Sequence, residues 1–260
     1  MGKREKGNMG TLRTPFRGVG NILRFNWHFY VIAAVFMITA AVFTAFLESP
    51  FRSILFFMVL SAVLAILTSL ILSWYIYDWY PLYAFNWIQE DDEAVNIINI
   101  HAGLDETSIM LRKKFPKATI TIMDFYDPAV HTEVSIKRAR KRYPPLSGTR
   151  TIQTTSINFS TGSADKIFLI LSAHEIRNNK ERVLFFKELK RLLKPDGNIY
   201  IMEHLRNFEN FMAYTIGFLH FHSYRAWRTT FRKAGLPVIK ELNQTPFIKV
   251  FELKKNGVTG

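Results

Sequence analysis

The chain has 260 residues, a formal net charge of +13 and no cysteine. The absence of cysteine excludes disulfide bonds, thiolate metal sites and cysteine nucleophiles. The positive charge favours an acidic partner, either nucleic acid or an anionic membrane surface. Hydrophobic residues make up 48 % of the sequence and concentrate in its N-terminal third, which favours the membrane.

Residues 29–80 are predicted to form a transmembrane helical hairpin. Two uncharged runs, 29–47 and 53–77, each have about the 20 residues that a helix needs to cross the hydrocarbon core. The short connection around Pro50 makes the two helices antiparallel, so both ends of the hairpin lie on one side of the bilayer. The basic segment 1–28 places that side in the cytoplasm. The alternative is a buried helical hairpin in a soluble protein.

Aromatic side chains gather where the second helix is expected to leave the bilayer, as they do in interfacial belts. They are Trp74, Tyr75, Tyr77, Trp79, Tyr80, Tyr83 and Trp87. Residues 81–93, which include the acidic stretch 90–93, are predicted to be a linker into a domain at 94–255. The predicted chain thus has a basic N-terminus, two membrane spans and one cytoplasmic domain.

The domain is predicted to begin with a βαβ unit. In chain order this unit contains a strand at 94–100, a turn with Ala102 and Gly103, a helix from Asp105, and a strand at 118–123 that ends at Asp124. Asp124 lies 21 residues after Gly103, close to the offset of about 20 at which nucleotide-binding folds hold ribose hydroxyls. The spacing therefore predicts a nucleotide-type cofactor on this unit.

The remaining segments continue to alternate between helix and strand. They are a helix at 128–143, strands at 149–155 and 165–172, a helix at 179–193, a strand at 198–202, a mainly helical stretch at 207–234, and strands at 238–242 and 247–253. The last two strands are joined by a turn so short that they must be antiparallel. The predicted fold is a Rossmann-like α/β domain with a seven-stranded sheet that is parallel except for its terminal hairpin.

From about residue 94 to residue 253, the chain resembles class I S-adenosylmethionine-dependent methyltransferases and is similar in layout to the quinone-biosynthesis C-methyltransferases. The resemblance rests on Asp124, on the strand 164–171, on the stretch 192–197 before the fifth strand, and on the closing β-hairpin. The predicted membrane hairpin lies outside it. In the family the first loop usually carries several glycines, whereas the loop from Asn99 to Asp105 keeps only Gly103.

The resemblance implies that S-adenosylmethionine is the cofactor and that the loops after the first four strands bind it. The implied cofactor residues are Asn99, His101, Ala102 and Gly103 of the first loop, Asp124 and Phe125 after the second strand, Ser156 and Ile157 beside the adenine, and Leu171 and Ser172 after the fourth strand. Asp124 is expected to accept hydrogen bonds from the ribose hydroxyls. Its alternative role is a helix N-cap, and the alternative for Gly103 is an ordinary turn.

Candidate catalytic and acceptor-binding residues follow the fourth and fifth strands. His174 is a candidate general base or, alternatively, a helix cap or surface residue. Glu203 can orient or deprotonate an acceptor, Arg206 can hold an anionic group, and the two can instead pair with each other. Glu175 is a further candidate for acceptor binding. Tyr214 and His220 lie in an aromatic segment that forms either a lid over a lipophilic acceptor or part of the core.

The combined prediction is a membrane-anchored methyltransferase that acts on a lipophilic or membrane-associated small molecule and needs no metal. The basic stretch 137–142 and the basic residues of 225–233 are predicted to meet anionic lipid headgroups rather than nucleic acid, because no RNA-binding motif accompanies them. One alternative is a catalytically inactive membrane adaptor. Another is a nicotinamide-dependent reductase, although the sequence has neither its G-x-G-x-x-G loop nor its Tyr-x-x-x-Lys pair.

Overall fold

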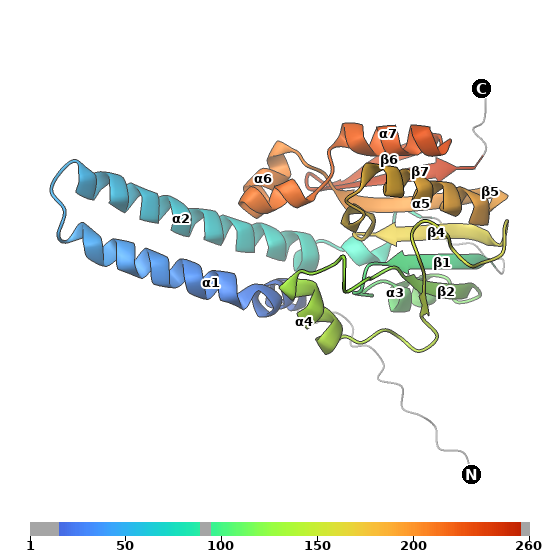
Figure 1. The fold of residues 1–260 in the computed structure, drawn as a ribbon, viewed down its shortest axis with the longest axis horizontal. Helices are drawn as coiled ribbons and strands as arrows, with labels where there is room; N and C mark the ends of the chain where they lie inside the picture. The colour runs from blue at the N-terminus through green and yellow to red at the C-terminus, as the bar shows by residue number, and fades with distance from the viewer. Residues whose placement is uncertain (1–15, 89–94, 256–260) are drawn as a thin grey trace, which may run out of the picture.

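A long helical hairpin projects from one end of an α/β domain (Figure 1). The computed structural model describes residues 16–88 and 95–255. Residues 1–15 of the predicted basic segment and the whole acidic stretch 90–93 therefore lie outside the described residues.

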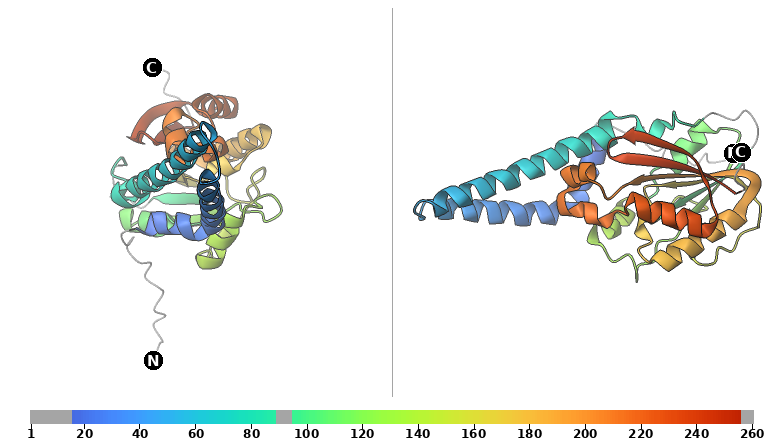
Figure 2. Two further views of the ribbon diagram at one scale, coloured as in Figure 1. Left: turned by 90° about the vertical axis from the view of Figure 1, so that its left-hand side faces the viewer. Right: turned by 90° about the horizontal axis from the view of Figure 1, so that it is seen from above.

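The hairpin consists of helix α1 (Arg17–Thr44) and helix α2 (Phe51–Trp74), and a π-helix, η1 (Tyr75–Trp79), continues α2. Both helices are long and apolar enough to cross a membrane. Most of their large apolar side chains are exposed; Phe36, for example, is 72 % exposed. Figure 2 shows that the hairpin stands clear of the domain over most of its length. The hairpin is thus a pair of antiparallel helices, as predicted.

The domain is built on a seven-stranded sheet with the order β3-β2-β1-β4-β5-β7-β6. The strands are β1 (Asn96–His101), β2 (Thr119–Asp124), β3 (Arg150–Thr151), β4 (Ala164–Ile170), β5 (Leu193–His204), β6 (Val238–Thr245) and β7 (Ile248–Lys254). The first five strands are parallel, and β7 is antiparallel to both β5 and β6. This topology confirms the predicted Rossmann-like sheet with an antiparallel terminal hairpin.

Helices cover both faces of the sheet. The helices of the domain are α3 (Ser108–Lys114), α4 (Val134–Arg142), α5 (Asn179–Leu192), α6 (Phe208–Tyr214) and α7 (Tyr224–Ala234), with 3-10 turns η2 (Leu82–Ala84), η3 (Ala173–Glu175) and η4 (Thr215–His220). One core contains Phe185 and Phe186 of α5 and Trp227 of α7. The second core, on the other face, includes Phe168 of β4 and Phe85.

The predicted linker and aromatic belt pack largely against the domain. Leu82 and Phe85 are each 1 % exposed, and Tyr75, Tyr77, Tyr80, Tyr83 and Trp87 pack against the second core. Trp79, in contrast, is 64 % exposed. These rings therefore help to cover one face of the sheet, and their place at a membrane interface stays a prediction.

Several element boundaries differ from the prediction; for example, the helix expected from Asp105 begins at Ser108. The strand expected at 149–155 is reduced to β3 (Arg150–Thr151), because it lies at the sheet edge and pairs only with the end of β2. The helix expected from residue 128 begins at Val134, because Asp127 accepts a hydrogen bond from Ala129 N and forms a turn there. The Lys-Pro-Asp-Gly stretch expected to separate helix from strand lies inside β5.

Partly buried polar contacts join η1 to the start of α1 and to the end of β5. The carboxylate of Asp78 in η1 accepts hydrogen bonds from Gly18 N at 2.6 Å and Val19 N at 2.8 Å, in the first turn of α1. Tyr77 OH lies 2.7 Å from Nε2 of His204 at the end of β5. Nδ1 of His204 has acceptors in Asn210 Oδ1 and Phe247 O, so the neutral ring donates from Nδ1 and accepts at Nε2.

Acid is expected to destabilise the protein through His204. Burial, together with the charge of His174, lowers the pKa of His204 to about 3, whereas an unfolded histidine titrates near about 6.5. Between these pH values the unfolded chain binds a proton here and the folded chain does not. The stabilisation is therefore complete above about pH 6.5 and is lost as the pH falls toward about 3. The expected loss from about pH 7.5 to about pH 5.5 is about 1 kcal/mol.

The measurement is urea unfolding of the full chain in detergent, followed by tryptophan fluorescence at both pH values. His204→Phe should reduce the pH dependence of the unfolding free energy by about 1 kcal/mol, and the control His131→Phe should leave it unchanged. Part of the dependence should remain, because burial and Arg182 also lower the pKa of His222 to about 3. An unaltered pH dependence in His204→Phe would contradict the prediction.

Candidate functional site

A cavity of about 250 Å³ lies between the base of the hairpin and the carboxyl ends of the central strands. This is the edge at which open α/β sheets bind ligands. Most of its lining comes from three parts of the chain, represented by Asn21 and Phe25 of α1, Ala102 and Thr107 after β1, and Ser172 and Glu175 after β4. Two of the predicted cofactor loops, those after β1 and β4, therefore share one cavity with part of α1 that the sequence analysis assigned to the basic N-terminal segment.

The loop after β1 holds unpaired polar atoms. Asn99 is completely buried, and its Nδ2 donates to Thr107 Oγ1 at 2.9 Å and to Ser108 Oγ at 2.7 Å. Among the described residues, Asn99 Oδ1, His101 Nε2 and Asp105 Oδ2 are buried and have no hydrogen-bond partner. Burial lowers the pKa of His101, so its ring is neutral. Unpaired buried polar atoms are costly, and three in one loop fit the binding of a polar ligand there.

Gly103 meets a conformational requirement of this loop. Its φ is +97°, and a Cβ at this position would lie 2.9 Å from the ring of Tyr126. A glycine is therefore needed to bring the loop against Tyr126. This requirement exists whether or not the loop also approaches a cofactor.

Asp124 lies at the tip of β2, as predicted, but both of its carboxylate oxygens have partners within the protein. Oδ2 accepts from Nη1 of Arg140 at 2.5 Å, and Oδ1 accepts from Tyr126 N at 2.9 Å. The Arg140 guanidinium stacks on the Tyr126 ring at 4.4 Å. The side chain does not cap α4, which begins at Val134. The ribose role of Asp124 stays a prediction, and it requires Arg140 to give up this ion pair.

The residues expected near the adenine do not line the cavity. Ser156 is exposed, and Ile157 is 2 % exposed with its N–H donated to Glu188. Phe125 is buried and packs against Phe185. Their predicted contacts with a cofactor remain untested.

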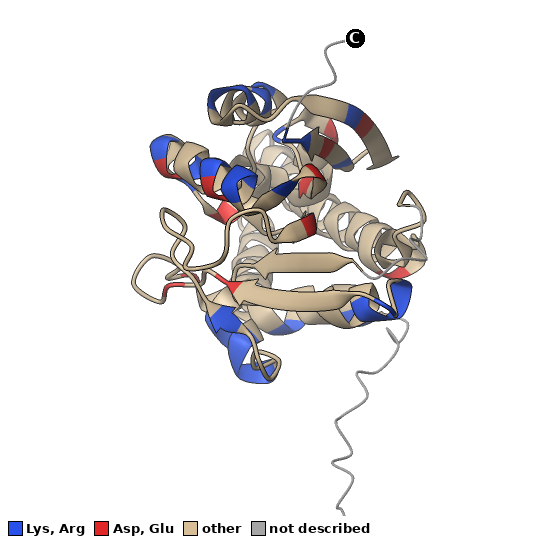
Figure 3. Cartoon of the chain, turned by 90° about the vertical axis from the view of Figure 1, so that its right-hand side faces the viewer, with Lys and Arg blue, Asp and Glu red and all other residues tan. Residues whose placement is uncertain are grey.

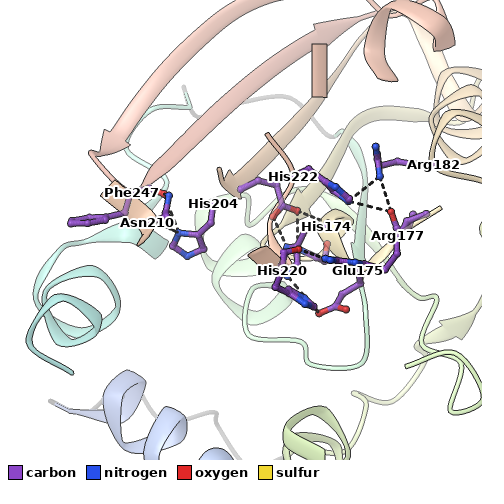
Figure 4. A network of polar contacts seen from close by, with 12 residues as sticks. His174, Glu175, Arg177, Arg182, His204, Asn210, His220, His222 and Phe247 are labelled. Atoms are coloured by element: carbon purple, nitrogen blue, oxygen red, sulfur yellow. Dashed lines mark hydrogen bonds and ion pairs between the residues drawn. The ribbon is translucent and has the colours of Figure 1, made fainter. Parts of the chain in front are cut away.

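The ends of β4 and β5 bring Glu203 and His174 together, and His174 lies within the polar network of Figure 4. Glu203 is completely buried and accepts from Ser172 N, His174 N and, at 2.6 Å, His174 Nδ1. Burial alone would lower the pKa of His174, but Glu203 and Glu175 raise it to about 10. Leu171, with φ of +51°, turns the chain out of β4 and lines the cavity with Ser172. His174 is thus a buried partner of Glu203 and not a surface residue.

Glu175 and His220 extend this cluster to the cavity wall. Oε1 of Glu175 lies 3.3 Å from Nε2 of His220 and 3.5 Å from Nε2 of His174. Burial would raise the pKa of Glu175, but its contacts with His174 and His220 hold the pKa well below its usual value. Glu175 also lines the cavity. The sequence analysis singled out all three residues without predicting that they meet.

Arg206 and Tyr214 lie outside the cluster of His174, Glu175 and Glu203. Arg206 donates from Nε to Phe221 O at 2.8 Å and from Nη2 to Leu219 O at 2.7 Å, so it fixes the segment after η4. Among the described residues, Glu203 pairs with His174 and not with Arg206. Tyr214 OH lies 2.9 Å from Tyr77 OH, and burial raises the pKa of Tyr214.

Two groups at the site were missed by the sequence analysis. Asn21 and Phe25 were placed in the basic N-terminal segment, where the polar Asn21 close to an apolar run was the available signal. Arg140 was assigned to lipid binding with its basic neighbours, and nothing in the local sequence separates it from them.

Residues 101–201 match the family model described as a methyltransferase domain. The chain carries a methyltransferase domain. This result confirms the methyltransferase domain, and with it the methyl donor S-adenosylmethionine, that the resemblance in the sequence implied. Among curated proteins, none matches the chain.

Solved structures with a similar fold include three methyltransferases. A SAM-dependent methyltransferase from Aquifex aeolicus is 16 % identical, with a TM-score of 0.45, and the match covers 62 % of this chain and 82 % of that chain. A SAM-dependent methyltransferase from Methanosarcina mazei is 19 % identical, with a TM-score of 0.46, and the match covers 67 % of this chain and 97 % of that chain. Geranyl diphosphate C-methyltransferase from Streptomyces coelicolor A3(2) is 11 % identical, with a TM-score of 0.46, and the match covers 65 % of this chain and 74 % of that chain.

Glu203→Ala is expected to lower the free energy of unfolding by about 3 kcal/mol or more, because it leaves a buried histidine and two buried N–H groups without their acceptor. The matched control is Glu209→Ala, at an exposed site on α6, which should change stability by less than about 0.5 kcal/mol. Urea unfolding of both variants in detergent measures the difference. Equal stability of the two variants would contradict the structural role of Glu203.

Proposed function

We propose that this protein is a membrane-anchored, S-adenosylmethionine-dependent methyltransferase and that its acceptor is a lipophilic small molecule which enters from the bilayer. The observation that carries the proposal is the cavity whose walls are the base of an apolar hairpin and the carboxyl edge of a methyltransferase sheet. The acceptor then reaches the site along the hairpin, without crossing bulk water.

Exposed apolar surface supports membrane insertion of the hairpin. Soluble proteins rarely expose large contiguous apolar patches. Here such side chains run along both helices, from Leu23 of α1 to Ile71 of α2. The apolar surface continues onto α6 and η4, where Phe208 is 71 % and Ile216 is 79 % exposed, and α6 lies beside α2 (Figure 1). We infer that α6 and η4 rest at the membrane surface.

Basic residues support a cytoplasmic, anionic lipid surface as the partner. Figure 3 views the end of the domain opposite the hairpin, and the basic residues that it shows on α5 and α7 lie away from the proposed bilayer, so the support comes from α4. On α4, which packs against the base of α1, Lys137, Lys141 and Arg142 are exposed. Each such charge near an anionic leaflet contributes about 1 kcal/mol of attraction. The positive charge in the N-terminal segment places both chain ends of the hairpin in the cytoplasm.

The residues at the cavity fit the cofactor in part. When bound, S-adenosylmethionine would supply an electrophilic methyl group on a sulfonium, with the neutral thioether as the leaving group. The unpaired Asn99 Oδ1 and Asp105 Oδ2 are acceptors for its ammonium group, and Asp124 is the acceptor for its ribose once Arg140 has moved. The polar cluster of His174, Glu175 and Glu203 would orient the reacting group of the acceptor and hold its proton, while Phe25 and its neighbours exclude water.

A non-catalytic membrane adaptor is the second candidate. The observation that favours it is the closed pair of Asp124 with Arg140, behind a loop with a single glycine. In this alternative the ion pair is permanent and the ribose position never opens. Cofactor binding therefore separates the two functions.

The first test is calorimetry of S-adenosylhomocysteine binding to the full chain in detergent. Asp124→Ala should weaken binding roughly tenfold or more, because a charge-assisted contact is lost. Arg140→Ala should tighten binding severalfold, since the competing ion pair is gone. The control Lys141→Ala, on the exposed face of α4, should bind as the unaltered chain does. An adaptor would give no saturable heat in any of the four proteins.

The second test is methyl transfer from labelled S-adenosylmethionine to a membrane lipid extract. Label should appear in the organic phase. Phe25→Ala should lower kcat/KM for the extracted acceptor roughly tenfold and leave S-adenosylhomocysteine affinity unchanged. The control is Phe36→Ala on the same helix, away from the cavity. Label confined to the aqueous phase would exclude a lipophilic acceptor, while retained cofactor binding would still support the methyltransferase.

A further inference from the structure

The cluster at the carboxyl edge has the composition of a transition-metal site. His174 and Glu175 belong to η3, and His220 is the last residue of η4. One potential ligand atom from each lies within 4.8 Å of the others (Figure 4). Two imidazoles and a carboxylate suit first-row divalent metals such as zinc or ferrous iron, whereas Mg²⁺ and Ca²⁺ prefer oxygen ligands alone.

The two imidazole–carboxylate distances within the cluster are long for charge-assisted hydrogen bonds and are compatible with ligands of a shared ion. Glu175 Oε1 lies 3.3 Å from His220 Nε2 and 3.5 Å from His174 Nε2. A charge-assisted N–H···O bond is about 2.7–2.9 Å long. Two ligands that each lie about 2.0–2.1 Å from a tetrahedral zinc ion are about 3.3 Å apart. The side chains are thus separated as an ion between them would require.

The other ring nitrogen of each histidine faces a second carboxylate. His174 Nδ1 lies 2.6 Å from Glu203 Oε2, and His220 Nδ1 lies 3.4 Å from Glu133 Oε1. Metal-binding histidines commonly donate their second N–H to a carboxylate, which fixes the tautomer and leaves the first nitrogen free for the metal. In both rings here, Nε2 is the nitrogen that faces Glu175, and it is the one that a metal ion between the three side chains would take.

Carboxylates outnumber the permanent cations around the cluster. Glu133, Glu175 and Glu203 each contact at least one of the two imidazoles, and a bound ion would take the place of the proton that His174 shares with these carboxylates. Arg177, which lies nearby, donates to the main-chain carbonyl of His220. A divalent ion would offset the negative charge of Glu203, which is completely buried, and of Glu175, whose side chain is 24 % exposed. Because Glu175 also lines the cavity, the ion would have an open side toward it.

We propose that His174, Glu175 and His220 bind one divalent transition-metal ion, with a remaining coordination position open to the cavity. The proposal departs from the sequence-based expectation that the protein needs no metal. It stands independently of the proposed function, since ion binding is measured without methyl transfer. An ion at this place acts as a Lewis acid toward an oxygen atom of a molecule in the cavity.

The experiment uses the full chain in detergent, purified without a polyhistidine tag and stripped with a chelator. Zn²⁺ alone is titrated by calorimetry, and Co²⁺ is added in parallel because its visible absorption reports coordination geometry. We expect saturable binding of one ion per chain and a Co²⁺ spectrum of a four- or five-coordinate site. Fe²⁺, added anaerobically in competition with Zn²⁺, distinguishes the two metals that suit this ligand set.

Variants decide whether these residues are the ligands. His220→Ala and Glu175→Gln should each weaken Zn²⁺ binding by roughly 100-fold or more, and Glu133→Gln, which removes only the carboxylate behind His220, by roughly tenfold. The control His131→Ala should bind as the unaltered chain does. The side chains of His220 and Glu175 are 28 % and 24 % exposed, so both variants keep the core intact, and circular dichroism verifies their fold.

Two results would overturn the proposal. One is the absence of saturable Zn²⁺, Co²⁺ or Fe²⁺ binding by the unaltered chain, which would leave the cluster as a hydrogen-bonded charge network. The other is Zn²⁺ binding that persists unchanged in both His220→Ala and Glu175→Gln.

Discussion

The contact of Asp78 with the first turn of α1 determines how the hairpin and the domain form one site. Its carboxylate accepts from Gly18 N and Val19 N, and a carboxylate at this end of a helix is also favoured by the helix dipole. A side chain at Gly18 would collide with Tyr77, where a Cβ would lie 2.5 Å from its Cβ. The close approach of η1 and α1 thus fixes the first helix over the sheet edge, where Asn21 and Phe25 become walls of the cavity.

Two buried charge systems flank this cavity and differ in kind. Asp124 and Arg140 form a single pair between a strand end and a helix that also leans on the hairpin, since Arg138 of α4 donates to Phe25 O at 2.7 Å. Glu203 and His174 belong to a larger cluster built on two adjacent strand ends. The first pair connects the cofactor loop to the position of α1, whereas the second is held by the sheet itself.

The fold was largely predictable because its local signals agree. Apolar runs gave the strands of the sheet, and Asn178 caps α5 by accepting from Lys180 N and Glu181 N, as expected for a helix that starts there. Glu203 and His174 were each singled out because parallel strands end at one edge. Their pairing follows from the adjacency of β4 and β5, which sequence order alone does not state.

The parts of the site that could not be predicted depend on long-range packing. Arg140 meets Asp124 only because α4 starts six residues later than expected and packs on α1. The part of the cavity lined by α1 depends on how the hairpin packs against the domain. Neither the periodicity nor the residue spacing of the sequence predicts this packing. His220 reaches Glu175 across 45 residues through a 3-10 turn, for which the sequence has no marker.

The orientation of the hairpin along the strand direction has a kinetic consequence for the proposed enzyme. With the open edge of the sheet turned toward the apolar helices, the acceptor arrives by lateral diffusion in a layer only a few nanometres thick. Turnover would then follow the number of acceptor molecules per unit area of membrane, while the methyl donor is drawn from the three-dimensional volume of the cytosol. The same catalytic centre would thus combine an acceptor confined to the membrane surface with a methyl donor dissolved in the surrounding solution.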